Sequence, residues 1–442
     1  MQYLFIESSK YILSVLLIIY AVAGMSIFAV KDTAFKTAMA VIQNSVNILF
    51  VIICSMHMFL LSDNAMYLAV MIFVLTSIFI YLFVTQTIFP ECNIYLLNNF
   101  SMLTSCGFMI ISRISINKSF KQFVITTISF GISIGLIFLF SKISFLKKLT
   151  WSYAAIGLML LSAVLVLGKF THGSKLSISL GPISIQPSEF VKIIFVFFLA
   201  SILWNEINAK KIILSALIAA LYVGVLVLSK DLGSALIYFI IYLFVLVLAT
   251  GNYLYMLLGL LLGSGASVVA FKIFSHVRVR VEIWQDPWPF IDNKGYQIIQ
   301  SLFSITSGGF WGTGLLKGTP TTIPFAETDF IFSVICEEMG IIFAIAILLI
   351  SISTFIEMLR VSSKINDSFY KQIVFGVAIS LLFQAFVTVG GGIKFIPLTG
   401  VTLPLISYGG SSIMSSTFMY FVVQAIYIRL RKEDKKAKSN SK

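Results

Sequence analysis

The chain has 442 residues, of which 59% are hydrophobic and only 11% carry a charge. This balance excludes a water-soluble globular protein, because the surface of such a protein needs far more polar side chains. The formal net charge of +13 would suit a nucleic-acid partner, but the Lys and Arg residues lie in short loops between apolar runs and in the C-terminal tail. That placement is typical of membrane proteins, and we expect no nucleic acid as a partner.

Apolar runs of about 20 residues, the length that a helix needs to cross a bilayer, recur along nearly the whole sequence. Runs this continuous exclude the alternating pattern of a membrane β-barrel. We therefore predict an all-α fold, a polytopic transmembrane helical bundle with about thirteen spans. The predicted spans are residues 11–30, 39–61, 66–86, 95–113, 121–141, 150–168, 187–204, 211–228, 232–250, 253–275, 329–357, 372–391 and 402–428.

The loops between these spans differ in charge and in length. Two longer segments, 169–186 and 276–328, are predicted to face outward, and the aromatic residues spread through the second predict that it folds onto the membrane surface. The positive-inside rule places the basic loops and the charged tail on the cytoplasmic side. These segments are 142–148, 210–211, 360–371 and 432–442.

The outward segment 276–328 passes into a span at Asp329, and two further acids, Glu337 and Glu338, follow within the apolar run. Helical spacing puts Asp329 and Glu337 on roughly one face. Ionised groups at membrane depth are costly unless they are paired or hydrated, so the pattern predicts a polar cavity and a functional site. The alternative is that Asp329 only caps the helix and that the two glutamates bind neighbouring helices.

Two arginines, Arg278 and Arg280, follow the span that ends near residue 275. In an extended segment residues i and i+2 point to the same face, which would suit a clamp on a phosphate or pyrophosphate group. The alternative is that they anchor a helix end at the membrane surface.

Acids also open two other predicted spans, with Glu189 in Gln-Pro-Ser-Glu and Asp231 in Asp-Leu-Gly. The helix macrodipole stabilises an acid at this position, so a structural cap and a catalytic role both remain open for each. Glycine runs at 390–392 and 409–410 allow close backbone approach or broken helices.

Taken in chain order, these segments resemble the SEDS family of peptidoglycan glycosyltransferases, the RodA/FtsW/SpoVE type. The likeness implies a ten-span core at 95–431, preceded by a transmembrane module at 1–94 with no assigned role and followed by the tail at 432–442. The matching motifs are Gln-Pro-Ser-Glu (186–189), Asp-Leu-Gly-Ser (231–234), Gly-Tyr-Gln-Ile-Ile-Gln-Ser (295–301), Gly-Gly-Phe-Trp-Gly-Thr-Gly (308–314), Thr-Asp-Phe-Ile-Phe (328–332), Glu-Glu-Met-Gly (337–340) and Pro-Leu-Ile-Ser-Tyr-Gly-Gly-Ser (404–411).

The resemblance implies an enzyme of the bacterial plasma membrane that polymerises lipid II at the outer face and works with a class B penicillin-binding protein. By the family pattern Asp329 is the catalytic residue, and we expect it to act as general base. No tightly bound cofactor is expected, although a divalent cation, Mg²⁺ or Mn²⁺, could assist at the pyrophosphate. The predicted substrate-binding residues are Arg278, Arg280, Glu189, Lys394, Glu337 and Asp231.

The sequence departs from the family pattern at two places. The Arg-Trp pair that usually precedes the glycine matching Gly181 is absent, and Phe325-Ala-Glu327 stands where many members have Glu and His. The missing pair leaves open a non-catalytic scaffold for a penicillin-binding protein. A transporter that flips a lipid-linked sugar precursor also stays open, because intramembrane acids beside glycine-broken helices mark transport pathways as well. The sequence does not distinguish elongation, division and sporulation.

Overall fold

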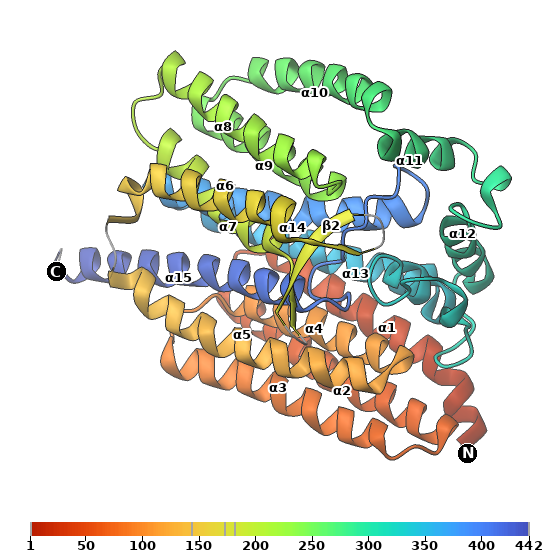
Figure 1. Cartoon of the computed structure of the whole chain (residues 1–442). Coiled ribbons are helices and arrows are strands. Elements are labelled where there is room, and N and C mark those ends of the chain that lie inside the picture. The colour runs from red at the N-terminus through yellow and green to blue at the C-terminus, as the bar shows by residue number, and fades with distance from the viewer. Residues whose placement is uncertain (1, 143–144, 172–173, 181–182, 441–442) are drawn as a thin grey trace.

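The computed structural model describes residues 2–142, 145–171, 174–180 and 183–440 (Figure 1). This part of the chain forms fifteen α-helices and three short strands. The helices are α1 (Gln2–Ala29), α2 (Thr33–Ser62), α3 (Met66–Ile88), α4 (Ile94–Ile114), α5 (Ile116–Lys142), α6 (Thr150–Leu167), α7 (Pro187–Leu203), α8 (Ala209–Leu228), α9 (Leu232–Thr250), α10 (Leu254–Ile273), α11 (Ser275–Gln285), α12 (Tyr296–Gly308), α13 (Ile331–Ser363), α14 (Ser368–Gly392) and α15 (Gly410–Asn440); the strands are β1 (Lys169–Thr171), β2 (Ser174–Leu180) and β3 (Ile183–Ile185).

Each of the thirteen predicted spans falls on a helix. Among the described residues, twelve helices are long and apolar enough to cross a membrane. The span predicted at 187–204 corresponds to α7, which has 17 residues and so reaches only the lower limit of about 17 for a crossing. The predicted fold class, a multi-pass helical membrane bundle, is confirmed.

The long helices run side by side, and the chain divides them into two flanks and a centre (Figure 1). Helices α1 to α3 form one flank and pack against α4, α5 and α13. Helices α8 to α10 lie on the opposite flank, where none of the described residues of α10 is buried. Helix α4 and the last two spans are mostly buried, so the core of the protein lies between the flanks.

The two ends of the bundle differ in their connections. Because successive spans alternate in direction, the segments 168–186, 274–330 and 393–409 share one end, which we call the loop end. The opposite end, which we call the tail end, carries the C-terminal part of α15 and the short basic loops (Figure 1). The predicted tail is not a separate segment, since α15 continues to Asn440.

The last predicted span begins later than expected. Residues 402–409 are not helical, and α15 starts at Gly410. Pro404 lacks a backbone N–H and disfavours a helix, and the side chain of Ser407 supplies local bonds, accepting from Leu403 N at 2.9 Å and donating to Thr328 O at 2.6 Å. The glycine pair at 409–410 marks the boundary that the prediction placed too early.

The segment predicted to face outward at 169–186 forms a small antiparallel sheet in the order β1-β2-β3, which was not predicted. The alternation Lys-Leu-Ser-Ile-Ser-Leu at 175–180 is the period-two signal of a strand. The sheet contacts α6, α7 and α15. Gly181, the glycine before which the Arg-Trp pair is absent, lies outside the described residues.

Candidate active site

Asp329 lies at the loop end, in the turn that runs from Pro324 to Phe330 directly before α13. This turn is held to the segment before α15, because Tyr408 N donates to Glu327 O at 2.7 Å. Phe330 occupies the N-cap position of α13 and makes no side-chain capping bond. The cap position of α13 thus falls on Phe330 and not on Asp329, and Asp329 is half-buried.

Arg280 reaches toward the same place from α11. Its Nη1 donates to the carbonyl oxygens of Leu398 and Thr399, both at 3.1 Å. Burial lowers the pKa of the Arg280 guanidinium, while the negative charges of Asp231 and Asp329 raise it. The two carboxylates are thus close enough to stabilise the charged guanidinium.

The residues 398–402, which we call the crossover segment, pass close to these charged groups. Gly400 has φ +74°, a left-handed conformation that favours glycine. A Cβ placed on it would lie 3.7 Å from Oδ2 of Asp329, so the backbone passes beside the carboxylate. A Cβ on Gly233 would lie 2.1 Å from Cγ2 of Val401, which shows that the start of α9 also packs against the crossover segment.

Asp231 closes the cluster from α9. Its side chain caps that helix by accepting from Ser234 N at 3.1 Å, and it also accepts from Ser188 Oγ at 2.9 Å. The cap predicted for Asp231 is therefore confirmed. The negative charge of the same carboxylate also acts on Arg280. The capping role therefore does not exclude the substrate-binding role predicted for Asp231.

Glu189 joins the cluster through two residues that the sequence analysis missed. It forms an ion pair with Lys192 at 3.0 Å, and both residues are buried. Lys192 Nζ also donates to Gln384 Oε1 at 2.5 Å, and Gln384 Nε2 donates to Thr402 O at 3.1 Å. A lysine within an apolar run, three residues after an acid, was the signal that could have revealed this pair.

A cavity of about 150 Å³ opens beside Arg280, and we call it the basic pocket. Lys294 and Lys394 also line it, and its described lining includes no acidic side chain. Trp284 donates from Nε1 to Lys394 O at 3.2 Å, which fixes this end of α11 to the turn after α14. The predicted grouping of Arg280 with Lys394 therefore appears in the structure, and Lys294 is a third cation that the sequence analysis did not single out.

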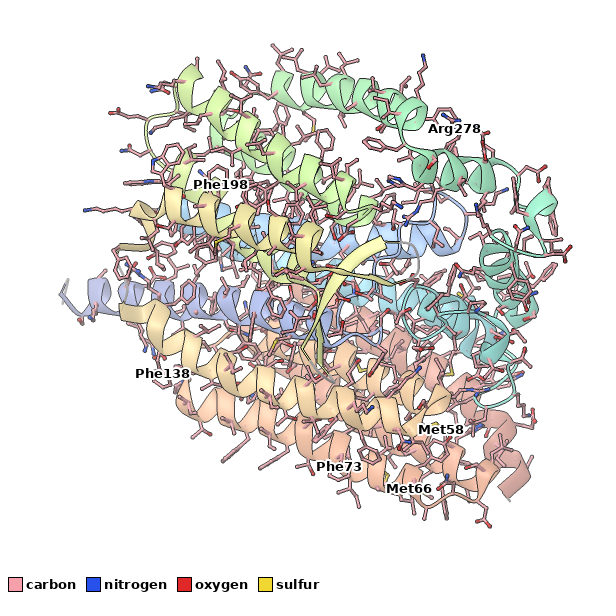
Figure 2. The ribbon with its side chains drawn as sticks, in the orientation of Figure 1. Met58, Met66, Phe73, Phe138, Phe198 and Arg278 are labelled. Atoms are coloured by element: carbon pink, nitrogen blue, oxygen red, sulfur yellow. The ribbon has the colours of Figure 1, made fainter. Side chains whose placement is uncertain are left out.

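Arg278 does not share this environment. Because α11 is a helix and not the extended segment that was predicted, residues i and i+2 point about 200° apart. Arg278 Nη2 donates to Lys272 O at 2.9 Å, and the guanidinium lies 6.0 Å from the centre of the Phe271 ring. Figure 2 shows Arg278 at the edge of the bundle, where α10 meets α11.

The two glutamates of α13 face a different partner from Asp329. Glu337 Oε1 accepts from Thr319 N at 2.8 Å, and Glu338 pairs with Arg113 at 2.5 Å. The pair of Glu338 with Arg113 of α4 agrees with the alternative that the glutamates bind neighbouring helices, whereas Glu337 binds the loop before Asp329. The structure places Glu337 at this contact and not among the residues around the crossover segment.

One further contact lies beside Asp329. Lys118, near the start of α5, forms an ion pair with Glu327 and lies 5.8 Å from the centre of the Tyr408 ring. Glu327 belongs to the stretch in which the sequence departs from the family pattern, so Lys118 supplies the basic partner for it. No sequence pattern connects these residues, because they lie far apart in the chain.

The described residues include no group of three or more His, Cys, Asp or Glu side chains placed to hold a metal ion. Fold and site together define a multi-pass membrane protein. At one end of its bundle, the carboxylates of Asp231 and Asp329 lie near Arg280, which also lines the basic pocket. Charged groups of this kind at the boundary of a membrane bundle mark a site that handles a polar substrate.

Comparison with known proteins identifies the family. Residues 92–432 match the family described as cell cycle protein, the FtsW/RodA/SpoVE group. The chain belongs to this family, and α1 to α3 lie outside the matched region.

Two sequence relatives illustrate the match. The chain is 40% identical over 275 residues to peptidoglycan glycosyltransferase RodA of Mycobacterium tuberculosis (strain ATCC 25618 / H37Rv), with 59% of this chain and 58% of that protein covered. It is 32% identical over 328 residues to the probable peptidoglycan glycosyltransferase FtsW of Pseudoalteromonas translucida, with 70% and 81% covered. The match thus spans little more than half the length of the mycobacterial relative.

Solved structures share the fold. A chain of a peptidoglycan synthase complex, described for its coordination of polymerization and crosslinking, is 26% identical with a TM-score of 0.65, covering 76% of this chain and 97% of that one. Rod shape-determining protein RodA of Thermus thermophilus is 23% identical with a TM-score of 0.56, covering 76% and 96%.

Proposed function

We propose that this protein is a peptidoglycan glycosyltransferase that polymerises lipid II into glycan strands at the outer face of the bacterial plasma membrane. The observation that carries the proposal is the placement of Asp329 and Arg280 at the same crossover segment, with Arg280 also lining the basic pocket. The names of the relatives, peptidoglycan glycosyltransferases, support the same activity.

The reaction joins two sugars at the expense of a lipid pyrophosphate. A hydroxyl oxygen of one sugar forms a bond to the anomeric carbon of another, and the bond from that carbon to the pyrophosphate oxygen breaks. The electron pair of the broken bond leaves with the lipid pyrophosphate. The hydroxyl proton passes to the Asp329 carboxylate, which requires that this carboxylate be ionised at the start. The nearby positive charge of Arg280 favours the ionised form.

The basic pocket suits the departing group. Pyrophosphate gains negative charge as the bond breaks, and fixed cations stabilise that charge in the transition state. Arg280, Lys294 and Lys394 supply three such cations around one cavity. The involvement of a divalent cation stays a prediction. Because the described residues hold no cluster of protein ligands, a Mg²⁺ or Mn²⁺ ion would take most of its ligands from the phosphates and water.

The outward orientation and the partner belong to the same proposal. Basic residues gather at the tail end, so the positive-inside rule places the loop end, with Asp329, outside the cytoplasm. A solved neighbour is part of a peptidoglycan synthase complex that polymerises and crosslinks. We therefore expect a class B penicillin-binding protein to supply crosslinking here as well.

Transport of a lipid-linked sugar is the second candidate function. The buried ion pair of Glu189 and Lys192 favours it, because paired charges inside a membrane bundle also mark transport pathways.

Purified protein, alone and with its penicillin-binding protein, separates the two functions. We expect glycan polymer from lipid II in detergent, where no compartment exists to transport into. Movement of lipid II across liposomes without any polymer from the same preparation would instead support the transporter.

A further inference from the structure

The N-terminal helices reach the loop that precedes Asp329. We call residues 311–319 the clamped loop. On α1, Glu7 forms an ion pair with Lys317, and Lys10 Nζ donates to Gly312 O at 3.4 Å. The ring of Tyr11 meets that of Trp311 edge to face, with centroids 5.2 Å apart. Three side chains of α1 thus contact one short loop of the core.

A buried histidine on α2 makes the most enclosed of these contacts. His57 is 1% exposed, and its Nε2 lies 2.9 Å from Leu315 O. Because a carbonyl oxygen only accepts hydrogen bonds, Nε2 must carry the hydrogen in this contact. The other ring nitrogen, Nδ1, lies 2.6 Å from Ser9 Oγ on α1. His57 therefore joins both N-terminal helices to the clamped loop.

The two residues directly before the clamped loop, Gly309 and Phe310, bond to a break in α13. Gly340 has φ +84° within this helix, so the regular bonding pattern stops there. Ile341 N donates to Gly309 O at 3.0 Å, and Ile342 N donates to Phe310 O at 3.3 Å. In an unbroken helix these two N–H groups would bond to residues 337 and 338.

The clamped loop donates hydrogen bonds to the two carbonyl groups of α13 that lose their helical partners at the break. Thr313 N donates to Glu337 O, and Gly314 N donates to Glu338 O, both at 2.9 Å. The backbone of the loop thus completes the hydrogen bonding of the first half of α13, residues 331–339. This half-helix follows Asp329 directly, so a shift of the loop moves the chain that carries the carboxylate.

We infer that α1 and α2 act as a built-in clamp, which holds the clamped loop in the break of α13 and thereby sets the position of Asp329. His57 is the central positioning residue of this clamp. The inference rests on the proposed function for its catalytic consequence, because Asp329 is taken as the general base. It assigns a role to two of the three helices that lie outside the matched family region.

A matched pair of substitutions on α2 tests the clamp in the full-length protein. His57→Leu removes both ring contacts. Asn47→Leu removes another buried hydrogen bond of the same helix, the 3.0 Å bond to Ser101 Oγ on α4. Hydrogen exchange of residues 311–319 and the steady-state kinetics of lipid II polymerisation are measured for both.

We expect His57→Leu to speed exchange in the clamped loop about tenfold or more and to lower kcat about tenfold, with the KM for lipid II within about twofold. Asn47→Leu should leave both within about twofold. Unchanged exchange in His57→Leu overturns the clamp, and faster exchange with an unchanged kcat overturns its effect on Asp329. If the wild-type protein makes no polymer, the proposed function fails, while the exchange data still decide whether the loop is held.

A second variant applies if His57→Leu does not fold. Glu7 and Lys317 are both partly exposed, so reversing either charge should be tolerated. We expect Glu7→Lys alone to speed exchange of the clamped loop, and Glu7→Lys combined with Lys317→Glu to restore it toward the wild-type rate. Equal exchange in the single and the double variant would contradict the clamp.

Discussion

Arg278 and Arg280 show how two identical side chains, two positions apart, acquire different surroundings. Arg280 bonds two carbonyl groups of the crossover segment and faces two carboxylates. Arg278 is exposed and bonds only locally, to Lys272 O. The difference follows from the helical geometry of α11. A comparison of the two residues therefore tests whether polymerisation needs a cation in the basic pocket or only a positive charge on α11.

Substitution of each arginine by glutamine should separate these roles. We expect Arg280→Gln to lower kcat/KM for lipid II polymerisation about 100-fold, because a fixed cation next to the developing phosphate charge is lost. Arg278→Gln should change it about twofold at most. Equal losses in the two variants, with both proteins folded, would exclude a special role for the basic pocket.

The same two residues show the limit of local sequence patterns. Arg-Val-Arg reads as a phosphate clamp only if the chain is extended, and nothing within the three residues reveals that α11 forms there. Glu337 illustrates a second limit. Helical spacing placed it on the face of Asp329, but the helix begins only at Ile331 and the clamped loop occupies the carboxylate. Both outcomes depend on tertiary packing.

At the scale of secondary structure elements, the break in α13 is the feature on which the site depends. Gly340 and Gly312 lie back to back: a Cβ on Gly312 would come 2.1 Å from Glu338 O, and one on Gly340 would come 2.3 Å from Phe310 O. Both glycines have positive φ angles, +79° and +84°. No other residue fits at either position without a backbone shift.

Alanine at Gly312 should therefore destabilise the protein by at least about 2 kcal/mol, since it combines an unfavourable backbone angle with a clash against backbone. Gly265→Ala in α10 is the control, because a Cβ there would meet nothing within 4 Å and alanine favours the helix. Thermal unfolding in detergent measures both. Equal melting temperatures for the two variants would contradict the tight packing of the loop on α13.

The elements themselves were predictable to different degrees. A long apolar run specifies a membrane span without help from the helices that pack against it, which is why each predicted span falls on a helix. The start of α15 was placed too early because residues 402–406 are apolar enough for a span, although Pro404 and the side-chain bonds of Ser407 hold them in a non-helical path. The crossover segment and the break at Gly340 depend on partners distant in sequence. The sequence motifs therefore indicated where these features lie, but not the backbone conformation that they adopt.

For the whole molecule, the three N-terminal helices determine at which end of the bundle α1 starts. An odd number of added spans places the start of α1 at the loop end, beside the clamped loop, while α4 begins at the tail end. The turn between α2 and α3 should then face outward together with Asp329, and the turn between α9 and α10 should face the cytoplasm.

Single cysteines at Asn64 and Asn252 test this orientation, since both positions are exposed and lie in short turns at opposite ends of the bundle. In a variant with Cys92, the native cysteine that is not fully buried, changed to serine, a membrane-impermeant maleimide should label Asn64→Cys in intact cells. Asn252→Cys should react only after the cells are opened. The reverse pattern would place Asp329 on the cytoplasmic side and contradict the proposed reaction.

Lipid II polymerisation by purified Asp329→Asn tests whether the Asp329 carboxylate accepts the proton of the attacking hydroxyl, as proposed. This change keeps the shape of the side chain but removes the base, so we expect the rate to fall at least about 100-fold. Asp292→Asn, at an exposed acid of the same segment 274–330, should retain the wild-type rate. An Asp329→Asn protein that polymerises as fast as the wild type would contradict the account.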